Sequence, residues 1–206
     1  MRLSKVIRPS DVMLAGMIGA SAAFNVAVYA IDRVASTPPF SITDSVVRVW
    51  SADNREAPAS LRTEQLRLLL GSGVFDAVAA VMPTEVEMGD RNTLWPSPAA
   101  AVSVDFWRVF DVHPARGRFF VQADDVLGDR VSPVVISHRL WHTRFAADPK
   151  VVDRAVLIGG RPAVVIGVAP EAFRYPKQHT DVWTVLPSGL PPGVSHQTPV
   201  IGRLTT

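Results

Sequence analysis

Residues 133–168 read PVVISHRLWHTRFAADPKVVDRAVLIGGRPAVVIGV and carry three signals that decide the fold. The first five residues form an apolar run that predicts a buried strand, and its last residue, Ser137, is of a type that caps helix N-termini. From 138 to about 146 apolar residues recur at helical spacing, and Asp148-Pro149 ends this helix. Two apolar runs joined by Gly159-Gly160 then predict a β-hairpin.

The first half of the chain has the pattern of a βαβ unit. VVRVW at 46–50 is rich in β-branched residues, LRTEQLRLLL at 61–70 has leucines at helical spacing, and VFDAVAAVM at 74–82 predicts a second strand. Between 83 and 104, short alternating runs interrupted by prolines and by Gly89-Asp90 predict strands and a hairpin.

Two further elements complete the prediction. DFWRVF at 105–110 predicts a short helix with Asp105 as its N-cap, and VWTVL at 182–186 predicts a final strand. Helices and strands are thus both predicted, so an all-helical bundle is not expected. We therefore expect an α+β fold.

The N-terminal segment VMLAGMIGASAAFNVAVYAI, residues 12–31, is uncharged over twenty positions. At about 1.5 Å per residue this length spans a bilayer core of about 30 Å, which predicts a transmembrane helix. Arg2, Lys5 and Arg8 precede it, so we expect a cytoplasmic N-terminus and a periplasmic main domain. Two other interpretations remain open, a signal peptide cleaved after Val28-Tyr29-Ala30 and a buried helix.

The predicted membrane helix carries small residues on one face, which let helices approach closely in lipid. These faces, Gly16 with Ala20 and Ala23 or Gly19 with Ala23, predict partner helices. The proline-containing segment 35–45 is typical of a linker. We therefore divide the chain into a cytoplasmic N-terminus and transmembrane helix at 1–34, this linker, and one domain at 46–206.

Composition excludes several function classes. Hydrophobic residues make up 48% of the 206 positions, enough to bury a core, and 21 basic residues nearly balance 19 acidic ones. Because the basic residues are scattered singly, no nucleic-acid-binding stripe is predicted. The chain has no cysteine, which excludes disulfides, thiolate zinc sites and thiol catalysis.

His138 and His142 are the strongest candidates for a metal site, because they lie one turn apart at the edge of the predicted helix. Zinc sites need a third and usually a fourth ligand, and no glutamate follows the first histidine as in the metalloprotease helix. The other histidines, His113, His179 and His196, fall in separate loops. The pattern favours an amphipathic scaffold helix over a metal site.

Candidates for catalysis are weaker still. Asp124-Asp125 could supply paired carboxylates, but acidic loop residues are usually solvated, and an anchored hydrolase using either with a histidine is the less favoured hypothesis. The serines at 103, 137 and 195 lie in no GxSxG motif, and Gly159-Gly160 has no phosphate-loop spacing. We predict no catalytic residue, no cofactor and no metal, and hence a protein that is not an enzyme.

Residues 97–186 contain a series of family-like motifs: GRxF before an acidic loop, SxxLWxxxFxxDPxVV, GxxxxVIGVxPxxFxxP and a final DxW. On these motifs the chain resembles the periplasmic core domain of MacB-type ABC-transporter permeases, above all the long permeases abundant in acidobacterial genomes. GASAAFNVAVYAIDRV at 19–34 is similar to the family's first membrane helix and its exit. The matching positions are Ser103, Phe106, Pro114, Gly117, Arg118, Phe120, Asp125, Ser137, Leu140, Trp141, Phe145, Asp148, Pro149, Val151, Val152, Gly160, Val165, Ile166, Gly167, Val168, Pro170, Phe173, Pro176, Asp181 and Trp183.

The resemblance implies a periplasmic domain with a porter-like βαβ part and an inserted, mostly β part, which carries no active site and transmits motion during export. It implies as partners the bilayer, an ABC ATPase subunit, other permease helices and a periplasmic adaptor. The alternative is a secreted or anchored periplasmic binding or interaction module left after signal-peptide cleavage.

The chain departs from the family pattern in two ways. Asp153 stands where the family has glycine, and Ile158-Gly159 replaces its leucine-asparagine pair. The second, third and fourth membrane helices and a nucleotide-binding motif are missing, so we expect a truncated permease or a stand-alone remnant of one. IGRLTT at 201–206 resembles the family's strand that leads back into the domain.

Overall fold

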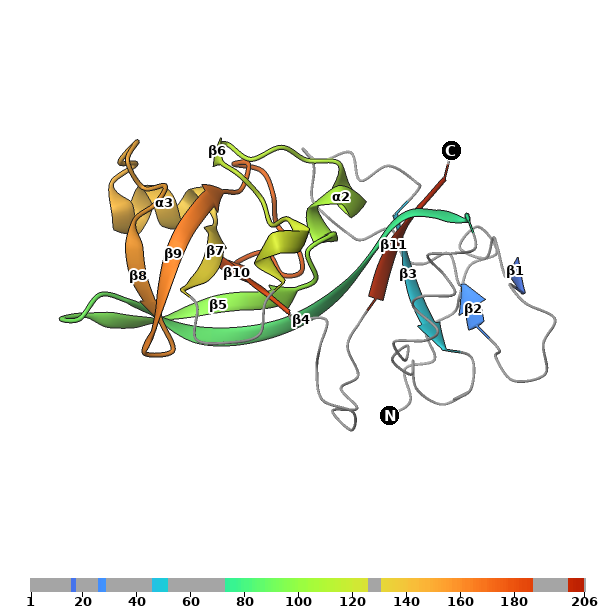
Figure 1. Ribbon diagram of the computed structural model, residues 1–206, viewed down its shortest axis with the longest axis horizontal. Coiled ribbons are helices and arrows are strands. Elements are labelled where there is room, and N and C mark those ends of the chain that lie inside the picture. The colour runs from blue at the N-terminus through green and yellow to red at the C-terminus, as the bar shows by residue number, and fades with distance from the viewer. Residues whose placement is uncertain are drawn as a thin grey trace, which may run out of the picture.

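A computed structural model gives the fold (Figure 1). It describes residues 73–125, 131–186 and 200–205, together with three strands nearer the N-terminus: β1 (Gly16–Met17), β2 (Val26–Val28) and β3 (Val46–Ser51). Strands dominate this part of the chain, with two α-helices among them. The predicted α+β class is thus confirmed in its coarse form.

The longest element, β4 (Phe75–Gly89), takes part in two sheets. Its first half pairs antiparallel with β11 (Val200–Leu204), up to the pair Ala80 and Val200. From Val81 onward it pairs antiparallel with β5 (Leu94–Val102). In Figure 1, β4 runs from the hairpin tip at one end of the molecule to the first sheet at the other.

Ser103, which follows β5, holds the point where β4 changes partner. The hydroxyl of Ser103 accepts a hydrogen bond from the Ala80 backbone N–H at 3.0 Å. The Ser103 backbone N–H in turn donates to the Ala80 carbonyl at 3.1 Å. Both backbone groups of Ala80 are therefore paired at the transition, as a chain leaving one ladder for another requires.

The first sheet has the order β1-β2-β3-β11-β4, and each neighbouring pair in it is antiparallel. Strands β3 and β4 confirm the predictions at 46–50 and 74–82 in position. They are parallel, as in a βαβ unit, but β11 lies between them. The helix predicted at 61–70 lies outside the described residues.

The second sheet closes into a ring of six strands. Starting from β4, the ring passes through β5, β10 (Val182–Val185), β7 (Ser132–Ile136), β9 (Arg161–Val168) and β8 (Ala155–Ile158). β8 returns to β4 through the pairs Met88 with Ile158 and Gly89 with Leu157. A short strand, β6 (Arg116–Gly117), pairs with the end of β9.

The interior of the ring is one hydrophobic core, to which all six strands contribute. Helix α3 (His138–Phe145) adds three buried side chains to it. Alternate residues on each strand face this core, as the pleat requires. The members are Met88, Ala99, Val134, Ile136, Leu140, Trp141, Phe145, Val151, Val156, Ala163, Val165, Val168 and Val182.

A second core joins the outside of the ring to the first sheet. It is centred on helix α2 (Phe106–Phe110), whose Trp107 stacks on Phe119 with ring centroids 3.9 Å apart. Aromatic side chains from the ring and its loops surround α2, among them Phe173, Tyr175 and Trp183. From the first sheet come Val46, Ala77, Ala79 and Ile201. Both sheets therefore bury side chains in the same core.

Most local predictions are confirmed. The Ser137 hydroxyl accepts a hydrogen bond from the Leu140 N–H at 2.9 Å, so Ser137 caps α3. Gly159 and Gly160 have positive φ values of 57° and 76°, the conformation of a tight hairpin turn between β8 and β9. The prediction for Asp105 is wrong in part: it is the N-cap residue of α2, but its carboxylate binds Arg108 instead of a backbone N–H.

Three prolines lie inside β4 and β5, where the sequence suggested breaks between strands. The Pro98 carbonyl accepts a hydrogen bond from the Asp181 N–H, on the side of β5 that faces β10. Because the nitrogen and the carbonyl of one strand residue point to the same side, the nitrogen of Pro98 also points away from β4. Pro96 lies two residues earlier on β5 and has the same orientation. On β4, the partner of Pro98 is Glu85, and Pro83 lies two residues before Glu85. The nitrogen of Pro83 therefore points away from β5. The β4–β5 ladder therefore loses no hydrogen bond to proline.

The transmembrane helix predicted at 12–31 is not observed. Within this range the structure describes only β1 and β2, and both are strands, while the other residues of the range lie outside the described part. Among the described residues no helix combines the length and the apolar character that crossing a membrane demands. The linker predicted at 35–45 also lies outside the described residues.

We expect Trp141→Ala to lower the free energy of unfolding by about 3–5 kcal/mol, because it empties a large site in the ring interior. Trp141 is 7% exposed, and its Nε1 donates to the Asp148 carbonyl at 2.8 Å. Chemical denaturation measures the effect. Thr143→Ala, on the exposed side of the same helix, is the control and should change stability by no more than about 0.5 kcal/mol. An unchanged midpoint for Trp141→Ala would contradict the packing of α3.

We expect Ser103→Ala to destabilise the domain by about 1 kcal/mol, because the Ala80 N–H loses its acceptor. Hydrogen exchange at the Ala80 amide should accelerate in this variant. Ser103→Thr keeps the hydroxyl and should exchange at close to the original rate. Equal exchange rates in the alanine variant and the original protein would show that Ser103 does not hold the transition in β4.

Candidate functional site

A groove of about 410 Å³ opens at the end of the ring where β7 begins. Its walls come from the start of β7, the β8–β9 turn, the end of β10 and the 3-10 helix η2 (Gln122–Asp124). The lining is mixed, with valines, Ile158 and prolines beside the polar side chains of Asp124, Ser132, Arg161 and Thr184. It is a candidate binding site among the described residues.

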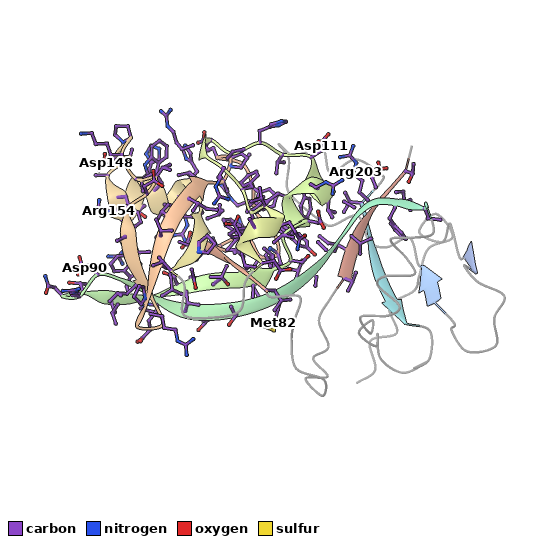
Figure 2. The ribbon with its side chains drawn as sticks, in the orientation of Figure 1. Met82, Asp90, Asp111, Asp148, Arg154 and Arg203 are labelled. Atoms are coloured by element: carbon purple, nitrogen blue, oxygen red, sulfur yellow. The ribbon has the colours of Figure 1, made fainter. Side chains whose placement is uncertain are left out.

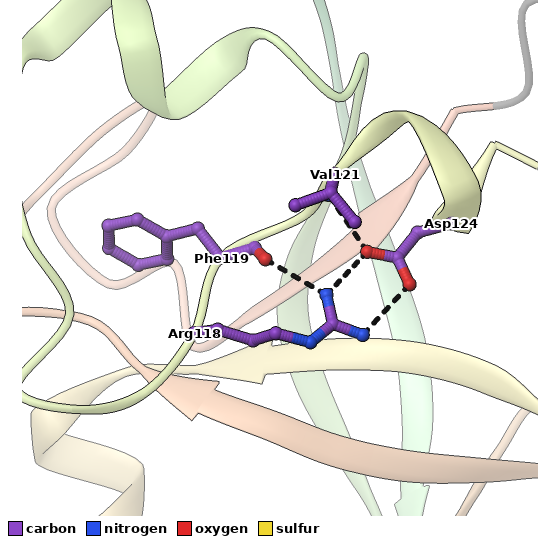
Figure 3. Close-up of polar contacts among 4 residues, drawn as sticks. All are labelled: Arg118, Phe119, Val121 and Asp124. Atoms are coloured by element: carbon purple, nitrogen blue, oxygen red, sulfur yellow. Dashed lines mark hydrogen bonds and ion pairs between the residues drawn. The ribbon is translucent and has the colours of Figure 1, made fainter.

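The acidic residue of the groove, Asp124, is held by Arg118 (Figure 3). The two guanidinium nitrogens of Arg118 donate to the two carboxylate oxygens of Asp124 at 2.6 and 3.0 Å, and Arg118 also donates to the Phe119 carbonyl at 3.1 Å. The Val121 N–H adds a third bond to Asp124, at 2.8 Å. Such bidentate, charge-assisted pairs fix both position and orientation.

The electrostatics of the pair follow from this geometry. The hydrogen bond from Arg118 lowers the pKa of Asp124, against the opposing effect of partial burial, and the Val121 N–H lowers it further. The same bond raises the pKa of Arg118. Both groups are therefore charged at neutral pH, and the carboxylate is already neutralised within the groove.

The backbone that presents Arg118 lies unusually close to β9. Gly117 has φ of +66°, and a Cβ at this position would lie 2.1 Å from the Ile166 carbonyl oxygen. It pairs with Gly167, where a Cβ would lie 2.2 Å from the Arg118 carbonyl oxygen. Two facing glycines thus allow the close approach that directs Arg118 toward Asp124.

From the sequence, Asp124 and Asp125 were considered as paired carboxylates for hydrolysis. In the structure the two side chains bind different partners. Asp124 binds Arg118, whereas Asp125 accepts a hydrogen bond from Gln122 Nε2 at 3.3 Å. A general acid needs a raised pKa, and the shift at Asp124 has the opposite sign. This geometry supports a structural role for the pair.

A second polar cluster lies at the opposite end of β7, around the buried carboxylate of Asp181. Ser137 donates its hydroxyl proton to Asp181 at 2.6 Å, and Arg139 donates to the other carboxylate oxygen. Ser137 and Asp181 are each only 4% exposed. The cluster connects the start of α3 to the start of β10, two segments 44 residues apart in sequence.

The serines considered as nucleophiles are accounted for by these contacts. Ser137 caps α3 and binds Asp181, and Ser103 binds the backbone of Ala80. Ser195 lies outside the described residues. Arg118 and Asp181 are among the positions that match the family motifs, but the motifs indicate no partner for either, and Arg139 is at none of the matching positions. The available signal was Asp181, an acidic residue directly before an apolar strand.

The structure brings two of the five histidines together. The rings of His138 and His142 have centroids 4.5 Å apart, while His113 and His179 are exposed on separate loops and His196 lies outside the described residues. Burial is the main cause of a lowered pKa at His138, followed by the charge of His142. In the described part of the chain, no three histidine or acidic side chains converge as metal ligands.

The chain matches the family model described as MacB-like periplasmic core domain over residues 12–196. Its fold is similar to the extracellular domain of the noncanonic ABC-type transporter YknZ from Gram-positive bacteria, with a TM-score of 0.57 and 18% identity, covering 78% of this chain and 84% of that one. It is also similar to the periplasmic region of MacB from Actinobacillus actinomycetemcomitans, with a TM-score of 0.56 and 15% identity, covering 74% and 68%. No curated protein matches the chain in sequence.

The Arg118–Asp124 pair should make stability depend on pH. The folded state lowers the pKa of Asp124 below the value of about 3.9 for an unfolded chain. The contribution is therefore complete above that value and is lost as pH falls through the lowered pKa. We expect the difference in unfolding free energy between the original protein and Asp124→Asn to be constant near neutral pH and to shrink in acid.

Asp125→Asn is the matched control, because it removes the neighbouring charge without touching Arg118. Urea titrations at a series of pH values measure all three proteins. A difference for Asp124→Asn that stays constant down to strongly acidic pH would contradict the role of the ion pair.

Proposed function

The chain belongs to the family of MacB-like periplasmic core domains, and on this premise we propose that it works within an ABC-transporter permease as a non-catalytic component that transmits motion for export. The family match covers most of the chain. The particular task, to pass movement between the membrane and the far end of the domain, is our inference from the arrangement of β4.

The observation that carries this proposal is the sharing of β4 by both sheets. A single strand of 15 residues enters from the first sheet and ends at the hairpin tip beyond the ring (Figure 1). β4 is hydrogen-bonded along its length, first to β11 and then to β5, so it cannot bend sharply without breaking these ladders. A displacement of the first sheet would therefore reach the ring directly along β4.

The shared core supports the same task. Side chains from the first sheet, from α2 and from the ring pack in one cluster, so the two sheets cannot slide past each other without opening it. An ion pair at 3.3 Å between Arg203 on β11 and Asp111 after α2 lies at the same junction (Figure 2). Because the Asp111 side chain is 73% exposed, this pair contributes little energy, and packing is the main connection.

The absence of catalysis is part of the proposal. Three of the polar residues that sequence analysis singled out, Ser103, Ser137 and Asp124, bind backbone or other side chains that hold the fold. In the described part of the chain, none of these three side chains forms a hydrogen bond with a histidine. These contacts support a domain that acts through its shape and its surfaces.

We further propose the organisation expected from the sequence. Residues 1–34 would comprise a cytoplasmic N-terminus and a transmembrane helix at 12–31 that anchors the chain in the inner membrane. The linker 35–45 and a periplasmic domain at 46–206, with a porter-like and an inserted part, would follow. The partners would be the bilayer, an ABC ATPase subunit, other permease helices and a periplasmic adaptor. The uncharged length and the preceding basic residues support the anchor.

The intact mass of a C-terminally tagged chain from carbonate-washed membranes tests the anchor. We expect an uncleaved chain in the membrane fraction, because residues 12–31 exceed the roughly 7–15 apolar residues of a signal-peptide core. A soluble chain that begins near Ile31 would instead identify a secreted binding module.

An ATPase assay on the same membrane preparation tests the transport assignment. We expect ATPase activity to co-purify with the tagged chain and to fall when Gly16→Leu and Gly19→Leu enlarge the small face of the predicted helix. Ser21→Leu, on the opposite side of that helix, is the control. Unchanged co-purification in the glycine variants would overturn the proposed helix contact.

A further inference from the structure

We propose that His138 and His142 together bind a divalent transition-metal ion of the zinc type at the surface of α3. The two residues are one helical turn apart, and their ring centroids are 4.5 Å apart with the rings tilted by 35°. Two imidazole nitrogens that each bind one ion at about 2.0–2.1 Å place their ring centroids roughly 5 Å apart. A small rotation of the exposed ring reaches that arrangement.

The helix holds the two rings in place. Ser137 fixes the first turn of α3, and Trp141, which lies between the histidines in sequence, is buried in the ring core. Trp141 contacts both imidazoles edge to face, with centroids 5.3 Å from His138 and 5.1 Å from His142. Because packing against Trp141 already restricts the His138 side chain, binding an ion there costs less conformational entropy than binding between two freely rotating histidines.

The surroundings leave the imidazoles available as ligands. His142 is exposed and His138 is half-buried, so an ion can reach both from solvent. Three arginines of this region have other contacts: Arg139 binds Asp181, Arg174 donates to the carbonyls of Glu171 and Phe173, and Arg116 lies over the Trp141 ring at 5.7 Å.

The chemistry of the ligands sets the class of ion. Imidazole nitrogen is a ligand of zinc, copper and nickel, whereas calcium and magnesium prefer oxygen. Since the described residues supply no third histidine or carboxylate to this point, the ion would keep water in its remaining positions. We therefore expect a reversible site that stabilises α3, distinct from the closed four-ligand sites that organise a fold.

Calorimetric titration of the full chain with Zn²⁺ at neutral pH tests the site. We expect one site per chain, whose affinity falls about tenfold or more in His142→Ala and in His138→Ala, because one ligand loses the high effective concentration of the second. His113→Ala, which removes an isolated exposed histidine, should bind as the original chain does. His142→Ala changes an exposed side chain and should fold.

Thermal unfolding gives a second measurement. Zn²⁺ should raise the melting temperature of the original chain and of His113→Ala through preferential binding to the folded state, and should not raise it in His142→Ala. Equal affinity in all variants, or no binding to the original chain, would overturn the proposal. Neither result bears on membrane anchoring or on the ATPase partner, so the site and the proposed function are tested separately.

Discussion

The exchange of partners along β4 is the constraint on which the rest of the structure depends. At Ala80 the strand still pairs with β11, and at Val81 it has begun to pair with β5. A chain that changes ladders exposes backbone groups unless another group takes them, and Ser103 supplies both a donor and an acceptor there. The direction of α2 follows, because Ser103 also accepts the Phe106 N–H at the start of that helix.

The elements between 133 and 168 could be predicted because each has its own local signal. Ser137 marks a helix start, Gly159 and Gly160 mark a turn, and the apolar runs mark strands, so the structure departs from prediction by only a residue or two there. The pairing of these strands could not be predicted in the same way. Ring closure depends on Met88 meeting Ile158, a contact 70 residues apart that no local pattern encodes.

The first half shows the same limit. Parallel strands at 46–50 and 74–82 were expected to be neighbours, yet β11, from the far end of the chain, lies between them. Likewise, Asp124 was noticed for its charge, but its function in the fold is set by Arg118, and that contact requires Gly117 and Gly167 to face each other. Residue types indicate what chemistry is available. Tertiary neighbours decide whether that chemistry is free for a ligand.

The prolines of the β4–β5 hairpin have a consequence for neighbouring molecules. β10 pairs only with residues 99–102 of β5, so the outer part of β5 has an open side among the described strands. Pro96 and Pro98 point their nitrogens toward that side, and neither can donate a hydrogen bond. An incoming strand would find no donor at either proline, and the Pro98 carbonyl is already bound by the Asp181 N–H. The outer part of β5 is thereby a poor template for pairing with a strand of another copy.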